Sequence, residues 1–187
     1  MGKIRIIGGT YRSRLVRFKT EAEGLRPTPD RVRESLFNWL GQDLTGKTCL
    51  DLFAGSGALG FEAVSRNAKQ VIMVEKNPSV VKDLRLNQEL LRVNNLEIVR
   101  QDALAYLTMC NRQFEVIFLD PPYSSNLLTS SLQLLNKVCR LKPDGLIYIE
   151  YETMPDLTDY SIIKQGKAST VNYALIKPNP SCVDQTV

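Results

Sequence analysis

The chain has 187 residues, enough for one domain that buries a core without disulfide bonds or a structural metal. It contains no histidine, which excludes Ser-His-Asp triads, Cys-His dyads, H-E-x-x-H zinc sites and any imidazole general base. The net charge of +4 is uneven, because residues 1–33 carry nine cations and three anions, a pattern typical of a face that meets phosphates but also of a solvated surface.

Residues 1–46 are expected to form a basic extension that belongs to the same domain as the rest of the chain. Two short strand-like runs within residues 4–18 predict a β-hairpin that carries exposed arginines. Apolar residues then recur at helical spacing, which predicts a helix over 29–40. Thr28 is the expected N-cap of this helix, and Pro29 is expected at its first position.

Residues 47–187 alternate between apolar runs and amphipathic stretches, a pattern typical of a parallel sheet covered by helices on both faces. Two last strand-like runs have only a turn between them, so we expect the sheet to end in a hairpin with one antiparallel strand. The sequence predicts a Rossmann-like, doubly wound, mostly parallel α/β fold with its ligand site at the carboxyl ends of the strands. The expected strands are 48–53, 70–75, 96–100, 114–120, 146–151, 160–167 and 170–178, and the expected helices are 57–66, 78–92, 103–110 and 127–139.

A glycine-rich loop follows the first strand of this region. Its residues 55–60, GSGALG, fit G-x-G-x-x-G and lie between a strand and a helix, as the motif requires. Alone, the motif fits NAD, FAD or S-adenosylmethionine. Asp51, four residues before the first glycine, would repel a pyrophosphate but attract the amino group of a methionine moiety, which favours S-adenosylmethionine.

Two further acids follow the next two strands. Glu75 is placed to accept hydrogen bonds from both hydroxyls of a ribose. Asp102 is placed either to accept one from an adenine amine or to cap the following helix. The predicted cofactor-binding residues are Asp51, Phe53, Ala54, Gly55, Ser56, Gly57, Gly60, Glu75, Lys76, Asp102 and Ala103.

The fourth strand ends in the tetrapeptide Asp120-Pro121-Pro122-Tyr123. Proline lacks an amide hydrogen and fixes its own φ, so the pair stops the strand and leaves backbone carbonyls free. Taken alone, the two prolines are better explained as a simple end to the strand, and only the other motifs favour a functional role.

The four cysteines, Cys49, Cys110, Cys139 and Cys182, are too scattered for a C-x-x-C pair or a zinc motif. We expect reduced thiols, mostly in the core. No apolar run has the length of a signal peptide or approaches the ~18 residues of a membrane span. These observations predict a cytoplasmic protein without a metal site or a membrane partner.

With the glycine loop, Glu75, Asp102 and D-P-P-Y in this order, residues 48–178 resemble class I S-adenosylmethionine-dependent methyltransferases that act on amino or amide nitrogens. The blocks RIIGGTYRSRLV, LRPTPDRVRESLFNWL and DLFAGSGALGFEAVSRNA resemble the RsmD family, and they extend the match to nearly the whole chain. The resemblance implies methylation of N2 of one guanine, of the guanine 966 type, in bacterial 16S ribosomal RNA. It also implies that the substrate is the assembling small subunit rather than naked RNA.

The resemblance implies catalytic roles for three residues. Asp120 and the carbonyl of Pro121 would each accept an N–H of the target amine and stabilise the positive charge that builds on it. Tyr123 would stack on a target base splayed out of the RNA, unless its ring simply packs over the strand end.

The basic N-terminal region supplies the predicted RNA contacts. Arg33 would either join these contacts or brace the cofactor loop. The protein is expected to be a monomer. The predicted RNA-binding residues are Arg12, Arg14, Arg17, Arg26 and Arg31, together with Tyr123.

Three alternatives stay open. An NAD(P)-dependent oxidoreductase would share the glycine loop and Glu75, but it would not account for Asp51 or D-P-P-Y. A non-enzymatic RNA-binding module would leave the glycine loop and Asp120 without a purpose. A methyltransferase could also act on another amino nitrogen, such as N6 of adenine in DNA or RNA or a protein amide.

Overall fold

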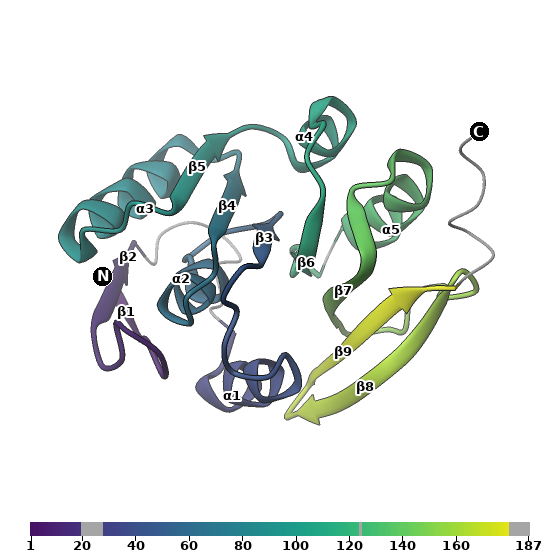
Figure 1. Ribbon diagram of the computed structural model, residues 1–187, viewed down its shortest axis with the longest axis horizontal. Helices are drawn as coiled ribbons and strands as arrows, with labels where there is room; N and C mark the ends of the chain where they lie inside the picture. The colour runs from purple at the N-terminus through teal and green to yellow at the C-terminus, as the bar shows by residue number, and fades with distance from the viewer. Residues whose placement is uncertain (20–27, 124, 180–187) are drawn as a thin grey trace.

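A seven-stranded sheet forms the centre of the molecule (Figure 1). The structure is a computed structural model that describes residues 1–19, 28–123 and 125–179. Its strands are β3 (Thr48–Asp51), β4 (Gln70–Glu75), β5 (Leu96–Arg100), β6 (Phe114–Leu119), β7 (Leu141–Tyr151), β8 (Tyr160–Ala168) and β9 (Val171–Pro178). They lie in the order β5-β4-β3-β6-β7-β9-β8. The strands β3 to β7 pair in parallel, and β9 is antiparallel to both of its neighbours. The predicted doubly wound sheet with its terminal hairpin is confirmed.

Helices cover both faces of this sheet (Figure 1). The helices α1 (Asp30–Trp39), α2 (Ala58–Ser65) and α3 (Pro78–Leu91) pack on one face, and α4 (Ala103–Met109) and α5 (Leu127–Val138) pack on the other. Each agrees with its sequence prediction to within one residue at either end. Among the described residues, none of the helices combines the length and apolar composition needed to cross a bilayer.

The strand β7 begins earlier than the sequence predicted. Its first residues, LKPDG, contain the proline and glycine that usually mark a turn, so the expected strand began only at residue 146. In the structure Leu141 pairs with Phe114, and the register shifts before the regular pairing of Val116 with Leu146. Residues 142–145 of β7 thus lie opposite residue 115 alone, and such an irregularity accommodates turn-forming residues within a strand.

The alternation of side chains along β6 shows how one strand supplies two cores. Val116 and Phe118 point into the cluster under α1, α2 and α3, whereas Ile117 and Leu119 point into the cluster under α4 and α5. Both faces are therefore buried, and the carboxyl edge of the sheet is left to form a site.

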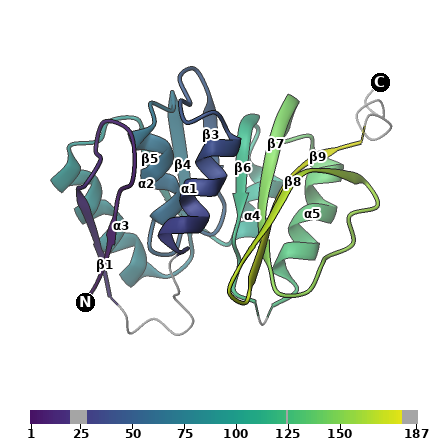
Figure 2. The same cartoon turned by 90° about the horizontal axis from the view of Figure 1, so that it is seen from below.

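A separate two-stranded hairpin, β1 (Gly2–Arg5) and β2 (Leu15–Phe18), packs beside α2 and α3 (Figure 2). Its inner face carries Ile4 and Val16, which are buried. On its outer face Lys3 lies directly opposite Arg17, and both are exposed. The hairpin therefore presents a basic surface, as the sequence predicted.

Thr28 does not cap α1, contrary to the sequence prediction. Pro29 occupies the N-cap position, and no side chain caps the helix there. The hydroxyl of Thr28 instead donates to Oδ2 of Asp120 at 3.3 Å, across 92 residues of sequence. The local pattern of a threonine before a proline indicates a cap, but it carries no information about a partner so distant in the chain.

Candidate active site

A cavity of about 250 Å³ opens at the carboxyl edge of the sheet, between the loops that follow β3, β4, β5 and β6. It brings together most residues that the sequence predicted for the cofactor and for catalysis. These are Asp51, Phe53, Ala54, Gly55, Ser56, Glu75, Lys76, Asp102, Ala103, Asp120, Pro121 and Tyr123. Sequence reasoning missed other lining residues, among them Thr28, Asn77, Gln101 and Leu127.

Gly57 and Gly60, also predicted as cofactor-binding residues, lie behind the cavity and shape its loop. Gly57 has a φ of 80° at the N-cap of α2, a conformation that favours glycine. The amide of Gly60 donates to Oδ2 of Asp51 at 3.0 Å. A Cβ atom at Gly60 would lie 3.1 Å from that oxygen and would collide with the side chain of Met73. The two glycines therefore hold the loop close to Asp51.

Asp51 is a buried carboxyl group with only 2 % of its surface exposed. Burial raises its pKa to about 7, and the nearby charge of Glu75 acts in the same direction. At neutral pH the group is therefore divided between its two forms. A cation in the cavity would favour the carboxylate.

Glu75 is held in place by two backbone amides. Gly55 donates to Oε2 at 3.1 Å, and Asn77 donates to Oε1 at 2.8 Å. A carboxylate oxygen accepts more than one hydrogen bond, so both oxygens keep capacity for a diol. Asn77 also caps α3 by accepting from Ser79 at 2.9 Å. Its position before Pro78 is a cap signal that could have identified it from sequence.

Asp102 is the N-cap of α4, which confirms one of its two predicted roles. Its Oδ1 accepts hydrogen bonds from Leu104 at 3.0 Å and Ala105 at 3.1 Å. The predicted contact with an adenine amine would therefore have to use Oδ2.

Asp120 lies half-buried at the end of β6, and it also lines the cavity. Burial raises its pKa well above the usual range, and the charges of Glu150 and Asp51 add to this. The hydrogen bond from Thr28 offsets part of the shift. The carboxyl group thus sits among acids, in an environment that would favour a ligand with positive charge.

Glu150, at the end of the neighbouring strand, is an acid that the sequence analysis did not single out. Its Oε1 accepts from the hydroxyl of Tyr148 at 2.8 Å, and its Oε2 accepts from Tyr123 at 3.4 Å. Burial raises its pKa, while its hydrogen bonds act in the opposite direction. An acid within the apolar run LIYIEY was the only signal available in the sequence.

The predicted RNA-binding arginines fall into different environments. Arg12, Arg14, Arg17 and Arg31 are exposed, and Arg26 lies outside the described residues. Arg33 is fully buried, so the expectation that it contacts phosphate is wrong. The alternative is supported, because Arg33 pairs with the helix that follows the glycine loop.

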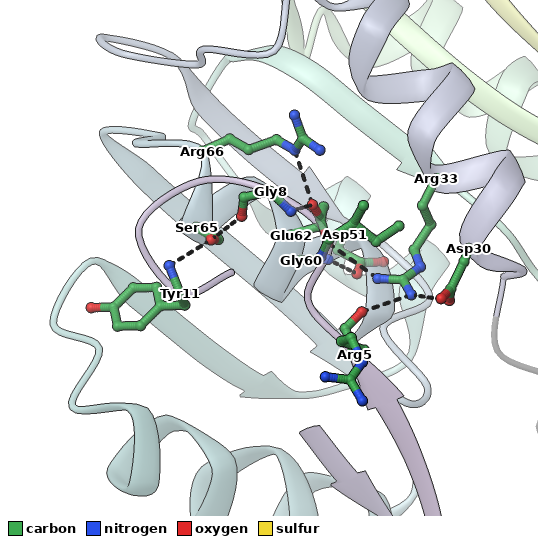
Figure 3. A network of polar contacts seen from close by, with 11 residues as sticks. Arg5, Gly8, Tyr11, Asp30, Arg33, Asp51, Gly60, Glu62, Ser65 and Arg66 are labelled. Atoms are coloured by element: carbon green, nitrogen blue, oxygen red, sulfur yellow. Dashed lines mark hydrogen bonds and ion pairs between the residues drawn. The ribbon is translucent and has the colours of Figure 1, made fainter. Parts of the chain in front are cut away.

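That pairing is centred on Glu62 of α2, which is fully buried (Figure 3). The two oxygens of Glu62 accept from Nη1 of Arg33 at 3.1 Å and Nε of Arg66 at 3.0 Å. They also accept from the backbone amides of Ile7 and Gly8, each at 2.9 Å. One carboxylate therefore ties the N-terminal hairpin loop and α1 to the helix that begins at the cofactor loop.

Comparison with known proteins places these features in one family. The family model described as "Conserved hypothetical protein 95" matches residues 4–177. The chain is 41 % identical over 181 residues to a Haemophilus influenzae protein named "Ribosomal RNA small subunit methyltransferase D", with 93 % of each chain covered. It is 39 % identical, with a TM-score of 0.85, to the solved structure "Putative methyltransferase yhhF from Escherichia coli", covering 95 % of this chain and 98 % of the other.

A more distant solved structure shares the fold. It is an RNA methyltransferase from Salinibacter ruber in complex with S-adenosyl-L-homocysteine, at a TM-score of 0.65 and 17 % identity. The alignment covers 80 % of this chain and 92 % of the other.

Proposed function

This chain belongs to the RsmD family of methyltransferases, and from that premise we propose that it transfers a methyl group from S-adenosylmethionine to N2 of a guanine in 16S ribosomal RNA. One observation carries the proposal: Asp120 and Pro121 line the same cavity as the glycine loop, Glu75 and Asp102. The groups proposed to accept the amine and those proposed to bind the nucleoside thus line one cavity.

The residues of the cavity suit a zwitterionic methyl donor. S-adenosylmethionine would supply an electrophilic methyl group on a sulfonium sulfur. Asp51 would attract its amino group, Glu75 would accept from its ribose, and Asp102 would accept from its adenine. Asp51, which would attract this amino group, would repel the pyrophosphate of a dinucleotide, and this argues against the oxidoreductase alternative.

Asp120 and Pro121 would bind the target amine by hydrogen bonds. The carboxylate would accept one N–H and the Pro121 carbonyl the other, which stabilises positive charge on the nitrogen as it attacks the methyl group in line. Tyr123 would stack on the base. Holding the reactants at near-attack distance contributes about 7 to 11 kcal/mol in favourable cases, so no imidazole base is required.

The test is methyl transfer from labelled S-adenosylmethionine to 30S subunits that lack the modification, to naked 16S RNA and to DNA, followed by nucleoside analysis. We expect label in N2-methylguanosine, with the subunit as the best substrate. Label in N6-methyladenine, or in protein alone, would replace the guanine assignment with one of the alternatives.

Replacing Asp51 with asparagine is expected to weaken binding of S-adenosylhomocysteine, because the ligand amino group loses a charged partner. The loss expected is about 10- to 100-fold, typical of a hydrogen bond to a charged group. In the wild type, affinity is expected to rise between pH 6 and 8 as Asp51, with its pKa of about 7, gives up its proton. Titration calorimetry measures both effects.

Asparagine at residue 51 is expected to abolish this pH dependence. The asparagine variant is also expected to be more stable than the wild type above pH 7. The pKa of Asp51 is higher in the folded than in the unfolded protein, so ionising this acid at high pH lowers the stability of the wild type, and asparagine does not ionise. Heat from NAD in place of S-adenosylhomocysteine would contradict the cofactor assignment.

The arginines of the hairpin are expected to contact phosphates at different distances from the target base. The backbone of Arg17 lies beside Asn87 of α3, whereas Arg14 reaches the carbonyl of Leu90. At 1.5 Å per residue, Leu90 is about 20 Å along α3 from the cavity residue Asn77. Arg14 and its neighbour Arg12 would therefore bind RNA remote from the target nucleotide.

Charge reversal of Arg12 and Arg14 together is expected to weaken RNA binding most at low salt. Each lost phosphate contact reduces the slope of log K against log salt by about 0.7 to 0.9. Filter binding across a salt series measures the slope. Charge reversal of Lys164 and Lys167, two exposed cations on β8, provides the control for the same change of net charge. An unchanged slope in the arginine variant would show that this face is merely solvated.

We further propose that residues 1–46 act as an RNA-binding extension of the catalytic domain 47–187, and that the protein works as a monomer in the cytoplasm. The contacts of Glu62 with the hairpin loop support a single unit.

A further inference from the structure

Glu150 is a buried acid for which the proposed reaction has no use. Leu119 pairs with Ile149, so Glu150 lies beside the end of β6, next to Asp120. Only 2 % of its surface is exposed, and it takes part in none of the ion pairs found among the described residues. Burying a carboxylate without a cation destabilises a fold, so such groups are concentrated at functional sites.

Two phenol hydroxyls hold Glu150 instead of a cation, and the hydroxyl of Thr28 also lies within reach of its carboxylate. The hydroxyl of Tyr148 donates to Oε1, and the Tyr148 ring packs with Phe118 and Tyr173 at centroid distances of 6.4 Å each. The other oxygen, Oε2, accepts from Tyr123, whose ring lines the cavity. One carboxylate oxygen is thus bonded to a tyrosine of the core, and the other is bonded to a tyrosine that lines the active-site cavity.

We propose that Glu150 is a positioning residue for methyl transfer, which holds the Tyr123 ring in the orientation that receives the target base. The inference rests on the proposed function, in which Tyr123 stacks on that base. A tyrosine side chain has two torsions, and a hydrogen bond at the hydroxyl restricts both. Without this contact the ring samples other rotamers, and fewer encounters with RNA place the amine at Asp120.

The test combines Glu150→Gln, Tyr123→Phe and the double variant. Methyl transfer to 30S subunits lacking the modification gives kcat and KM, and calorimetry gives the affinity for S-adenosylhomocysteine. Each single variant is expected to raise KM for the subunit by about tenfold, as for the loss of one hydrogen bond, with cofactor affinity unchanged. The double variant is expected to have a KM no higher than that of either single variant, because Glu150 acts on base binding through Tyr123. The charge of Glu150 also raises the pKa of Asp120, which affects the pH dependence of kcat rather than KM.

Asp144→Asn is the matched control, since Asp144 is an exposed acid at the other end of β7. It is expected to leave all these quantities unchanged. Rises in KM that multiply in the double variant would overturn the inference, and so would a fall in cofactor affinity as large as the rise in KM. If Glu150→Gln does not fold, Tyr123→Phe decides alone, and a wild-type KM in that variant overturns the proposal.

Failure of the proposed function and failure of the role given to Glu150 would produce different results. A wild-type protein that methylates none of the RNA substrates removes the premise and the inference together, whereas active wild type with unaffected variants removes only the role of Glu150.

Discussion

Replacing Asp120 with asparagine is expected to lower kcat for methyl transfer by about 10² to 10³, the loss typical of removing one preorganised electrostatic contact. Asparagine preserves the shape of the side chain, but it can turn its NH₂ group toward the target amine and carries no charge to stabilise the nitrogen. Initial rates with saturating subunits and S-adenosylmethionine measure the effect.

Cofactor binding is the internal control for this variant. Calorimetry with S-adenosylhomocysteine is expected to give an affinity within about threefold of the wild type, because the carboxylate is proposed to face the substrate. A variant that retains wild-type turnover would exclude the role given to Asp120. In the wild type, the raised pKa of Asp120 means that the rate falls as pH is lowered through it, because the required carboxylate becomes protonated.

Replacing Glu62 with glutamine is expected to reduce the free energy of unfolding by about 3 to 5 kcal/mol, as when one partner of a buried ion pair is removed. Arg33 and Arg66 would remain in the interior without their shared carboxylate. A neutral amide offers one acceptor oxygen, so it cannot also satisfy the amides of Ile7 and Gly8. Urea denaturation measures the loss.

The chain offers a matched control at Glu97, which pairs with Arg112 at the surface at 2.6 Å. Both side chains are about half exposed, so Glu97→Gln is expected to cost less than about 1 kcal/mol. Equal losses at residues 62 and 97 would mean that burial of the Glu62 network adds nothing. The Glu62 variant is also expected to bind RNA more weakly, because the hairpin loop loses its attachment to α2.

Most of the fold could be predicted from sequence because its signals are local. The apolar run ending at Glu75 matches β4 residue for residue, since a strand buried on both faces needs an uninterrupted run. The run over 96–100 also matches β5, an edge strand that is only partly buried. The helices follow from their apolar spacing in the same way. The β7 strand was harder to predict, because Leu141 pairs with β6 ahead of the irregular residues 142–145, and the local turn signal of these residues hides that pairing.

The cavity could be predicted in outline because the fold itself brings its parts together. In a parallel sheet the carboxyl ends of the strands meet at one edge, so motifs after successive strands converge without specific contacts between them. This is why Asp51, Glu75, Asp102 and Asp120 line a single space.

The sequence alone therefore determined the class of fold, the glycine loop and the acids at or just after the ends of β3, β4, β5 and β6, all of which depend on neighbours in the chain. The tertiary structure alone decided those partners of polar side chains that are distant in the chain. Thr28 was expected to cap a helix but bonds to Asp120, Arg33 pairs with Glu62 across 29 residues, and Tyr123 meets Glu150 across 27. A buried polar group must find a partner somewhere, but which one it finds depends on how distant segments pack.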